Sequence, residues 1–116
     1  MYKSRVGLIG LGQWGKNIYR NLDTLNVIEK VYDNNPENLS QFVSNKSKIA
    51  KHPNELILSK DINSIFIASP ASTHKDYIIR SLLNNKNVFV EKPLCLSLDE
   101  SYEIKKVSNQ VNKIVF

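Results

Sequence analysis

Three glycines within six residues constrain this chain more than any other feature of its sequence. Residues 10–15 read Gly-Leu-Gly-Gln-Trp-Gly, a complete G-x-G-x-x-G pattern. An apolar run at residues 5–9 comes before it. After it, residues 14–25 carry apolar side chains at spacings of four and three, namely Ile18, Leu22 and Leu25. The pattern predicts a strand, a tight turn and an amphipathic helix.

Each glycine in this arrangement has a physical role. Gly10 lets the chain turn tightly, Gly12 leaves space where a side chain would block a pyrophosphate, and Gly15 lets the helix pack closely on the strand. The free amides at the start of the helix would then face the phosphates. The loop therefore predicts a dinucleotide site that includes Gln13 and Trp14. Glycines in a purely structural turn remain the alternative.

An acidic residue stands where such a site needs one. Asp33 ends a second β-rich run, residues 27–32, and lies 18 residues after Gly15. A carboxylate there accepts hydrogen bonds from ribose hydroxyls and repels a 2′-phosphate. Asn34 and Asn35 follow with no arginine beside them, so we expect NAD rather than NADP, with Asn34 as a further contact. Alternatively, Asp33 caps the helix that begins near Pro36.

The same glycines come close to a phosphate-binding P-loop. Gly10, Gly15 and Lys16 satisfy the first seven positions of G-x-x-x-x-G-K-[ST]. The eighth position is Asn17, which has no hydroxyl for a magnesium ion. We therefore do not expect a P-loop nucleotidase.

The rest of the chain alternates strand and helix patterns. We expect a helix led in by an Asn cap at residues 36–44, a short strand at 48–50, and a short helix at 53–58. A buried strand follows at 64–69, then a helix at 72–83, a strand at 87–90, a helix at 97–111 with Leu98, Tyr102 and Ile104 inward, and a strand at 113–116. This order predicts an α/β Rossmann fold, a doubly wound parallel sheet with strand order 3-2-1-4-5-6.

Composition bounds the class of protein. The chain has 116 residues, of which 41% are hydrophobic and 23% charged, so one folded domain over residues 1–116 is expected. Cys95 is the only cysteine, which excludes an internal disulfide and a cysteine-based metal site. No apolar run is long enough to span a membrane, and the 16 basic residues are scattered, so we expect a cytoplasmic protein that binds neither membrane nor nucleic acid.

Four correctly spaced motifs together resemble a known family. They are the opening Gly7-Leu8-Ile9-Gly10-Leu11-Gly12-Gln13-Trp14-Gly15-Lys16-Asn17, then Asp33, the turn Ser69-Pro70-x-x-Thr73-His74, and Glu91-Lys92-Pro93. The chain resembles the glucose-fructose oxidoreductase / inositol dehydrogenase / rhizopine catabolism (Gfo/Idh/MocA) family over essentially its whole length. Within that family, the Trp-Gly-x-Asn start is most similar to dehydrogenases of UDP-linked amino sugars.

The resemblance implies a nicotinamide-dependent oxidoreductase that acts on CH–OH groups of sugars, sugar nucleotides or polyols. It implies that Lys92 is catalytic, beside the nicotinamide and the substrate hydroxyl, that Glu91 lies on the cofactor side, and that Pro93 shapes the turn, for which a cis peptide is available. Ser69, Pro70, Thr73 and His74 would line the ribose and nicotinamide. From the residues alone, Thr73 is also read as a helix cap, His74 and His52 as surface residues, and Glu91-Lys92-Pro93 as an exposed strand end.

One departure from the family leaves the function open. Family members carry a second, larger domain that supplies the substrate pocket, and this chain ends at Phe116. Two hypotheses follow: the chain is the cofactor-binding half of a sugar or sugar-nucleotide dehydrogenase, or it is a free-standing module that binds or senses a dinucleotide. On either hypothesis we expect the chain alone to bind NAD without turning over a sugar. A homo-oligomer is left open.

Overall fold

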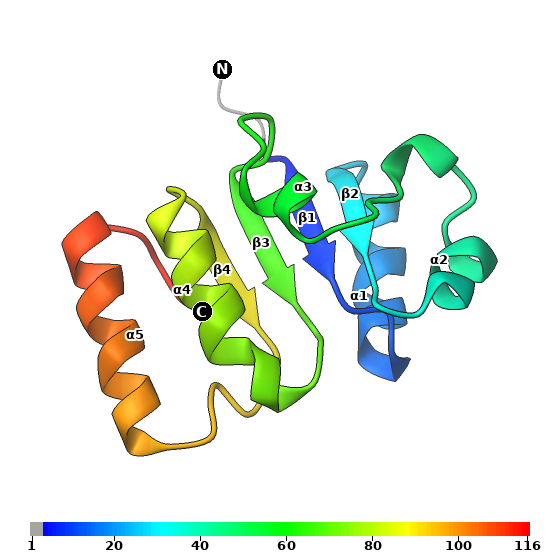
Figure 1. Ribbon diagram of the computed structural model, residues 1–116. Helices are drawn as coiled ribbons and strands as arrows, with labels where there is room; N and C mark the ends of the chain where they lie inside the picture. Colours follow the sequence, from blue (N-terminus) through cyan, green and yellow to red (C-terminus); the bar gives the residue numbers. More distant parts are fainter. Residues whose placement is uncertain (1–3) are drawn as a thin grey trace.

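The computed structural model describes residues 4–116, which form one parallel sheet with helices on both faces (Figure 1). The strands are β1 (Val6–Ile9), β2 (Ile28–Tyr32), β3 (Ser64–Ile67) and β4 (Asn87–Val90). The α-helices are α1 (Gln13–Thr24), α2 (Pro36–Phe42), α3 (Asn54–Ile57), α4 (His74–Leu83) and α5 (Leu98–Val111). Two short 3₁₀ helices, η1 (Lys46–Lys48) and η2 (Ala71–Thr73), complete the described elements. None of the described helices is long and apolar enough to cross a membrane.

The strands lie in the order β2-β1-β3-β4, all parallel. Two single bridges extend this order, Ile49 beside Val31 on β2 and Val115 beside Val88 on β4. The α/β Rossmann fold is confirmed, but the four-stranded order differs in detail from the predicted 3-2-1-4-5-6, whose two outermost positions are occupied by these bridges. The predicted strands at residues 48–50 and 113–116 are nevertheless single bridges rather than strands. At the predicted strand 48–50, η1 takes up the residues before Ile49. The Asn45 side chain accepts a hydrogen bond from the Ser47 amide and so begins a helical turn there.

The two faces of the sheet belong to two cores. On one face, α1 and α2 cover β1 and β2; on the other, α3, α4 and α5 cover the sheet (Figure 1). The first core contains Leu8, Leu11, Leu22, Val31 and Leu39, and the second contains Ile57, Ile65, Ile67, Ile78, Leu82 and Ile104. Helices on both faces require strands that are buried on both sides, which explains why β1 is apolar at every position but its glycine.

The predicted helix boundaries agree with the structure more closely than the predicted buried faces of the helices do. Asn35 caps α2 through a hydrogen bond from the Glu37 amide (3.1 Å), as the sequence predicts. Leu25, by contrast, lies just past the end of α1 and is exposed. In α5 the predicted inward residues Leu98 and Tyr102 are exposed as well. The buried stripe of α5 is instead Ile104 with Val107 and Val111, at spacings of three and four.

One part of the sheet has an aromatic row on the α1 side. Phe66 stacks on Phe89 with ring centroids 4.9 Å apart, and Phe89 stacks on Phe116 at 5.8 Å. A shallow cavity runs along this row and is also lined by Ile114. Phe116 at the end of the row is 81% exposed.

Candidate functional site

The carboxyl ends of the four strands meet at one edge of the sheet, the lower edge in Figure 1. Ile9 is paired with both Tyr32 and Ile67, and Ile67 with Val90, so the strands end level with one another. The glycine loop, Asp33, the Ser69–Thr73 turn and the Glu91–Pro93 turn therefore lie along one edge. Ligands of open parallel α/β sheets bind at this edge.

The glycine loop has the geometry that its sequence predicts. Gly10 has φ of +107°, a conformation that side chains rarely adopt, and a Cβ there would lie 2.6 Å from the backbone of Ala68. A Cβ on Gly15 would lie 2.1 Å from the carbonyl oxygen of Gly10, so this position is closed to any side chain. Gly10 thus makes the turn, and Gly15 lets α1 pack against it.

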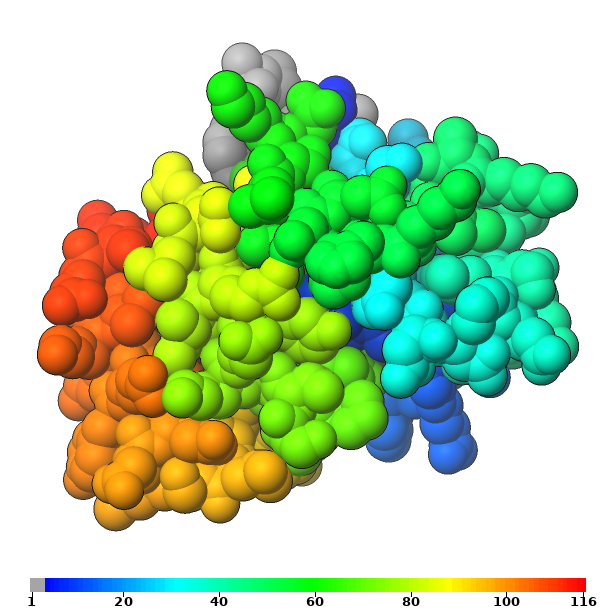
Figure 2. Space-filling view, in the orientation of Figure 1, coloured from blue at the N-terminus to red at the C-terminus, as the bar shows by residue number. Residues whose placement is uncertain are grey.

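Gly12 differs from its two neighbours because the space above it is open. A Cβ on Gly12 would meet no atom within 4 Å. Gly12 is also the N-cap residue of α1 and, as a glycine, offers no side chain to cap the first amides. Figure 2 shows the start of α1 (blue) standing clear at the lower edge, where Gln13 and Trp14 are exposed. This open helix terminus has the chemistry of an anion site and room for the anion.

Asp33 lies directly after β2 and faces the glycine loop. Its Oδ1 accepts a long hydrogen bond from the Leu11 amide (3.4 Å), and its Oδ2 accepts from the Asn38 side chain (2.7 Å). Oδ2 also accepts from the Asn35 amide at 3.4 Å. The cap of α2 is Asn35 itself, which leaves the Asp33 carboxylate at the mouth of the site.

A cavity of about 110 Å³ joins three of these segments. Six of the residues predicted from the sequence line it, namely Gly10, Asp33, Asn34, Ser69, Pro70 and Thr73. Ile9, Tyr32, Ser72 and Tyr77 complete the lining and were not predicted. Burial raises the pKa of Tyr77 above its usual value of 10.0, so this hydroxyl stays a neutral donor at physiological pH.

The turn after β3 is braced by hydroxyl groups. Ser69 Oγ and Thr73 Oγ1 lie 2.7 Å apart, and Thr73 Oγ1 donates to the Pro70 carbonyl oxygen (2.6 Å). Thr73 occupies the N-cap position of α4, but its side chain makes no capping hydrogen bond. The interpretation of Thr73 as a side-chain cap is therefore wrong, and its hydroxyl instead shapes one wall of the cavity.

His74 is buried, so its interpretation as a surface residue is wrong; His52, in contrast, is exposed as predicted. The two ring nitrogens of His74 contact the backbone carbonyl oxygens of Ser69 and Pro93, each at 2.7 Å. His74 thus lies between two of the loops at this edge. Its spacing of four and eight residues from Ile78 and Leu82, both buried on α4, was the sequence signal for its burial.

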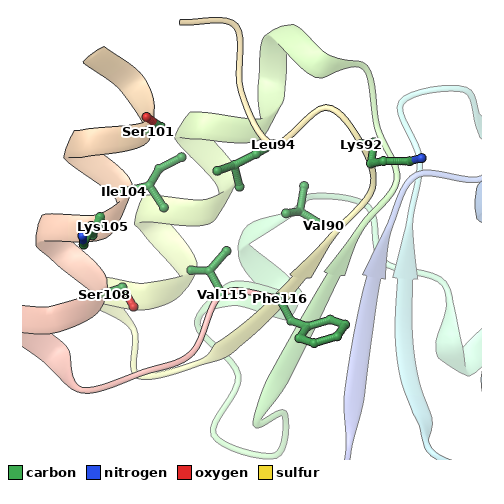
Figure 3. A pocket seen from close by; sticks show the side chains of 9 residues that line it. All are labelled: Val90, Lys92, Leu94, Ser101, Ile104, Lys105, Ser108, Val115 and Phe116. Atoms are coloured by element: carbon green, nitrogen blue, oxygen red, sulfur yellow. The ribbon is translucent and has the colours of Figure 1, made fainter. Parts of the chain in front are cut away.

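The Glu91–Pro93 turn continues from β4 over the same edge. The Glu91 amide still pairs with the Ile67 carbonyl oxygen (2.9 Å), so the turn begins at a defined point of the sheet. Lys92 is exposed, and the Lys92–Pro93 peptide bond is cis. In Figure 3 the Lys92 side chain points away from α5 and across the ends of the neighbouring strands.

A larger cavity, of about 410 Å³, lies between α5, β4 and residues 113–116 (Figure 3). Its lining is mostly apolar and includes Val90, Leu94, Ile104, Val115 and Phe116. The backbone of Lys92 borders this cavity while its amino group points toward the glycine-loop side. The cavity thus meets the edge that carries the predicted site residues at Lys92 alone, and none of the other predicted site residues lines it.

Lys16 argues against the P-loop alternative in the structure as well. Its amino group lies 4.2 Å from the centroid of the Phe42 ring on α2. A P-loop lysine instead reaches the phosphates over the glycine loop. The fold and the glycine loop at this edge together define a Rossmann-type domain of the dinucleotide-binding class.

Comparison with known proteins identifies the family. The oxidoreductase family with an NAD-binding Rossmann fold, Gfo/Idh/MocA, matches residues 4–116, and the chain belongs to it. The predicted recognition, fold class and cofactor are thereby confirmed at the level of the family. Myo-inositol 2-dehydrogenase of Thermotoga maritima is 28% identical over 116 residues, which are 97% of this chain and 35% of that protein.

Solved structures agree on the fold. A probable dehydrogenase from Thermotoga maritima superposes with a TM-score of 0.89 at 28% identity, over 97% of this chain and 35% of that one. UDP-N-acetylglucosamine 3-dehydrogenase from Acidithiobacillus ferrooxidans has a TM-score of 0.83 at 18% identity, over 99% of this chain and 38% of that one, a likeness of fold alone. The chain spans about a third of the length of these relatives.

Proposed function

We propose that this chain is the cofactor-binding part of a dehydrogenase that acts on a sugar, a sugar nucleotide or a polyol. The observation that carries the proposal is the open space above Gly12 at the start of α1, with the Asp33 carboxylate beside the same loop, where its Oδ1 accepts from the Leu11 amide (3.4 Å). A helix terminus without a side-chain cap favours a phosphate, and the carboxylate favours two vicinal hydroxyls.

Successive residues along this edge fit successive parts of a dinucleotide. The amides after Gly12 would hold the pyrophosphate, with Gln13 and Trp14 beside it. Asp33 and Asn34 would hold the adenosine ribose, because a carboxylate accepts hydrogen bonds from hydroxyls. Ser69, Pro70 and Thr73 would line the nicotinamide half, together with Glu91. A bound nicotinamide supplies the hydride acceptor or donor.

Lys92 is proposed as the catalytic residue. Its side chain extends over the carboxyl ends of the strands, the side on which the glycine loop lies. There its amino group would bind the substrate hydroxyl or carbonyl oxygen and move the proton at that oxygen. The backbone of Lys92 is tied to the sheet through the Glu91 amide, so the side chain starts from a rigid point.

The substrate site needs more protein than these residues provide. The relatives are about three times as long as this chain, and the aromatic row Phe66, Phe89 and Phe116 leaves part of the sheet uncovered by described residues. We propose that a substrate domain covers this face and closes the site over Lys92. Inositols and sugar nucleotides, which the names of the relatives specify, are the first substrates to test.

A direct titration tests the cofactor assignment. The chain is titrated with NADH while the fluorescence of Trp14, the only tryptophan, is followed. Saturable quenching that NAD reverses is expected, because Trp14 is 66% exposed beside Gly12. Quenching by magnesium ATP with no effect of NADH would overturn the proposal in favour of a P-loop site.

A further inference from the structure

The His74 ring is an unusual connection between two loops. It is 1% exposed, at the first position of α4. Nε2 lies 2.7 Å from the Ser69 carbonyl oxygen, and Nδ1 lies 2.7 Å from the Pro93 carbonyl oxygen. Ser69 is two residues past β3 and Pro93 three residues past β4, so one side chain links both turns.

The partners of the ring determine its chemistry. A backbone carbonyl oxygen only accepts hydrogen bonds, whereas a neutral imidazole has one donor nitrogen and one acceptor nitrogen. A neutral ring would therefore satisfy one carbonyl and place a lone pair against the other. Both contacts, at 2.7 Å, are at the short end of the N–H···O range, where charge-assisted hydrogen bonds also lie. Both contacts are favourable only when both ring nitrogens carry a proton.

We infer that His74 is a doubly protonated bridge that sets the position of the Lys92 turn relative to the Ser69 turn. This inference rests on the proposed function for its meaning, since Lys92 and Ser69 are assigned to the two sides of the nicotinamide. His74 is a positioning residue, because its two nitrogens are both occupied by backbone oxygens. It acts on the reaction through the segments it joins.

No ionisable side chain is among the polar contacts of the His74 ring in the described part of the chain. On α4, Lys75 pairs with Glu103 of α5 (2.9 Å) and Asp76 with Arg80 (3.3 Å). The elements β3, β4 and η2, which pack against α4, have no ionisable side chains. The remaining ionisable groups on these segments are Tyr77 on α4, Glu91, Lys92 and Cys95 after β4, and Asp99, Glu100, Tyr102, Lys105 and Lys106 on α5. Both polar contacts of the ring are with carbonyl oxygens, whose dipoles stabilise a positive charge on it.

The first test is the ring spectrum of the unmodified chain. His52 and His74 are the only histidines. His52 is an internal reference, because its Nδ1 accepts a hydrogen bond from the Asn54 amide (3.1 Å) and therefore carries no proton. In long-range ¹H–¹⁵N correlation, we expect two protonated ring nitrogens for His74, and for His52 an Nδ1 without a proton. A single protonated nitrogen on His74 would overturn the inference.

The second test uses His74→Gln with His52→Gln as the matched control. A glutamine side chain cannot donate hydrogen bonds in two opposite directions, as a doubly protonated imidazole does. Backbone order parameters at Lys92 and Leu94 should fall from about 0.85 to below about 0.6 in His74→Gln and stay unchanged in His52→Gln. The Kd for NADH should rise about fivefold in His74→Gln alone, as expected for the loss of one hydrogen bond.

The outcomes separate the two proposals. Unchanged order parameters at Lys92 in a folded His74→Gln would refute the bridge, even if NADH binds. Absence of NADH binding by the unmodified chain would refute the cofactor assignment, while the ring spectrum still decides the bridge. If His74→Gln does not fold, the ring spectrum of the unmodified chain alone decides.

Discussion

The Asn38 side chain of α2 donates a hydrogen bond of 2.7 Å to the Asp33 carboxylate. This contact orients the carboxylate that is proposed to bind the adenosine ribose. The other two hydrogen bonds of Asp33, from the Leu11 and Asn35 amides, are both 3.4 Å long. Asn38 is therefore the strongest of the three donors. Its role was not visible in the sequence, because an Asn in the first turn of a helix is ordinary.

Replacing Asn38 should weaken the binding of the cofactor without unfolding the chain. In Asn38→Ala, Asp33 loses its shortest donor, and the Kd for NADH is expected to rise about fivefold, the effect of one hydrogen bond. Calorimetric titration measures it. Ser40→Ala on the same helix removes an exposed hydroxyl that bonds only to the Glu37 carbonyl oxygen, so it should bind NADH normally. Equal affinities in the two variants would remove Asn38 from the site.

Cofactor choice should follow from Asp33. NADH is expected to bind at least about tenfold more tightly than NADPH, because the carboxylate repels a 2′-phosphate. Asp33→Ala should weaken NADH binding and narrow the difference in affinity between NADH and NADPH. Parallel titrations with both cofactors test this, and tighter binding of NADPH by the unmodified chain would contradict it.

Gly12 and Gly15 should respond to alanine in opposite ways. Gly12→Ala adds a methyl group to open space, so its melting temperature should stay within a few degrees while NADH affinity falls about tenfold or more. Gly15→Ala places the methyl group 2.1 Å from the Gly10 carbonyl oxygen, and its melting temperature should fall by about 10 °C or more. Thermal melts and titrations of both variants measure this. A Gly12→Ala protein that loses binding only because it unfolds would make Gly12 structural.

The sequence predicted those parts of the molecule that depend on local pattern. The glycine loop, Asp33 after the second strand and the Asn35 cap each depend on a few neighbouring residues, and all three are found as expected. Burial was harder to predict, because it depends on what packs against a helix. Tyr102 lies four residues after Leu98, a helical spacing, yet both are exposed, because the buried stripe of α5 passes through Ile104 instead. His74 was interpreted by its polarity, although it shares a face of α4 with Ile78.

Lys86 should make stability depend on pH. Its side chain is 5% exposed and donates to the Ser59 carbonyl oxygen, and burial lowers its pKa from the usual 10.5. Between the lowered pKa and 10.5, the unfolded chain binds more protons than the folded one, so the free energy of unfolding rises with pH in this window. In Lys86→Met this contribution to the slope is expected to vanish.

Thermal melts between about pH 8 and about pH 10 measure the difference in slope. The exposed Lys60, replaced by Met, is the control and should keep the slope of the unmodified chain. The absolute stability of Lys86→Met also reflects the lost contact with Ser59, so only the slope is compared. Parallel curves for the unmodified chain and Lys86→Met would show that burial of Lys86 has no effect.

The last prediction concerns activity: residues 1–116 should bind NAD and turn over no sugar. Hydride transfer needs the substrate held against the nicotinamide and shielded from water, and orientation supplies much of the rate. Every predicted site residue here lies on the cofactor edge, and Lys92 is exposed there. A chimera that adds the second domain of the myo-inositol 2-dehydrogenase relative should reduce NAD with an inositol as substrate. Lys92→Ala should lower its kcat by about a hundredfold or more while NADH affinity stays within about twofold, and Lys60→Ala should change neither. Turnover by the isolated chain would contradict the need for a second domain, and full activity of the Lys92→Ala chimera would exclude Lys92 from catalysis.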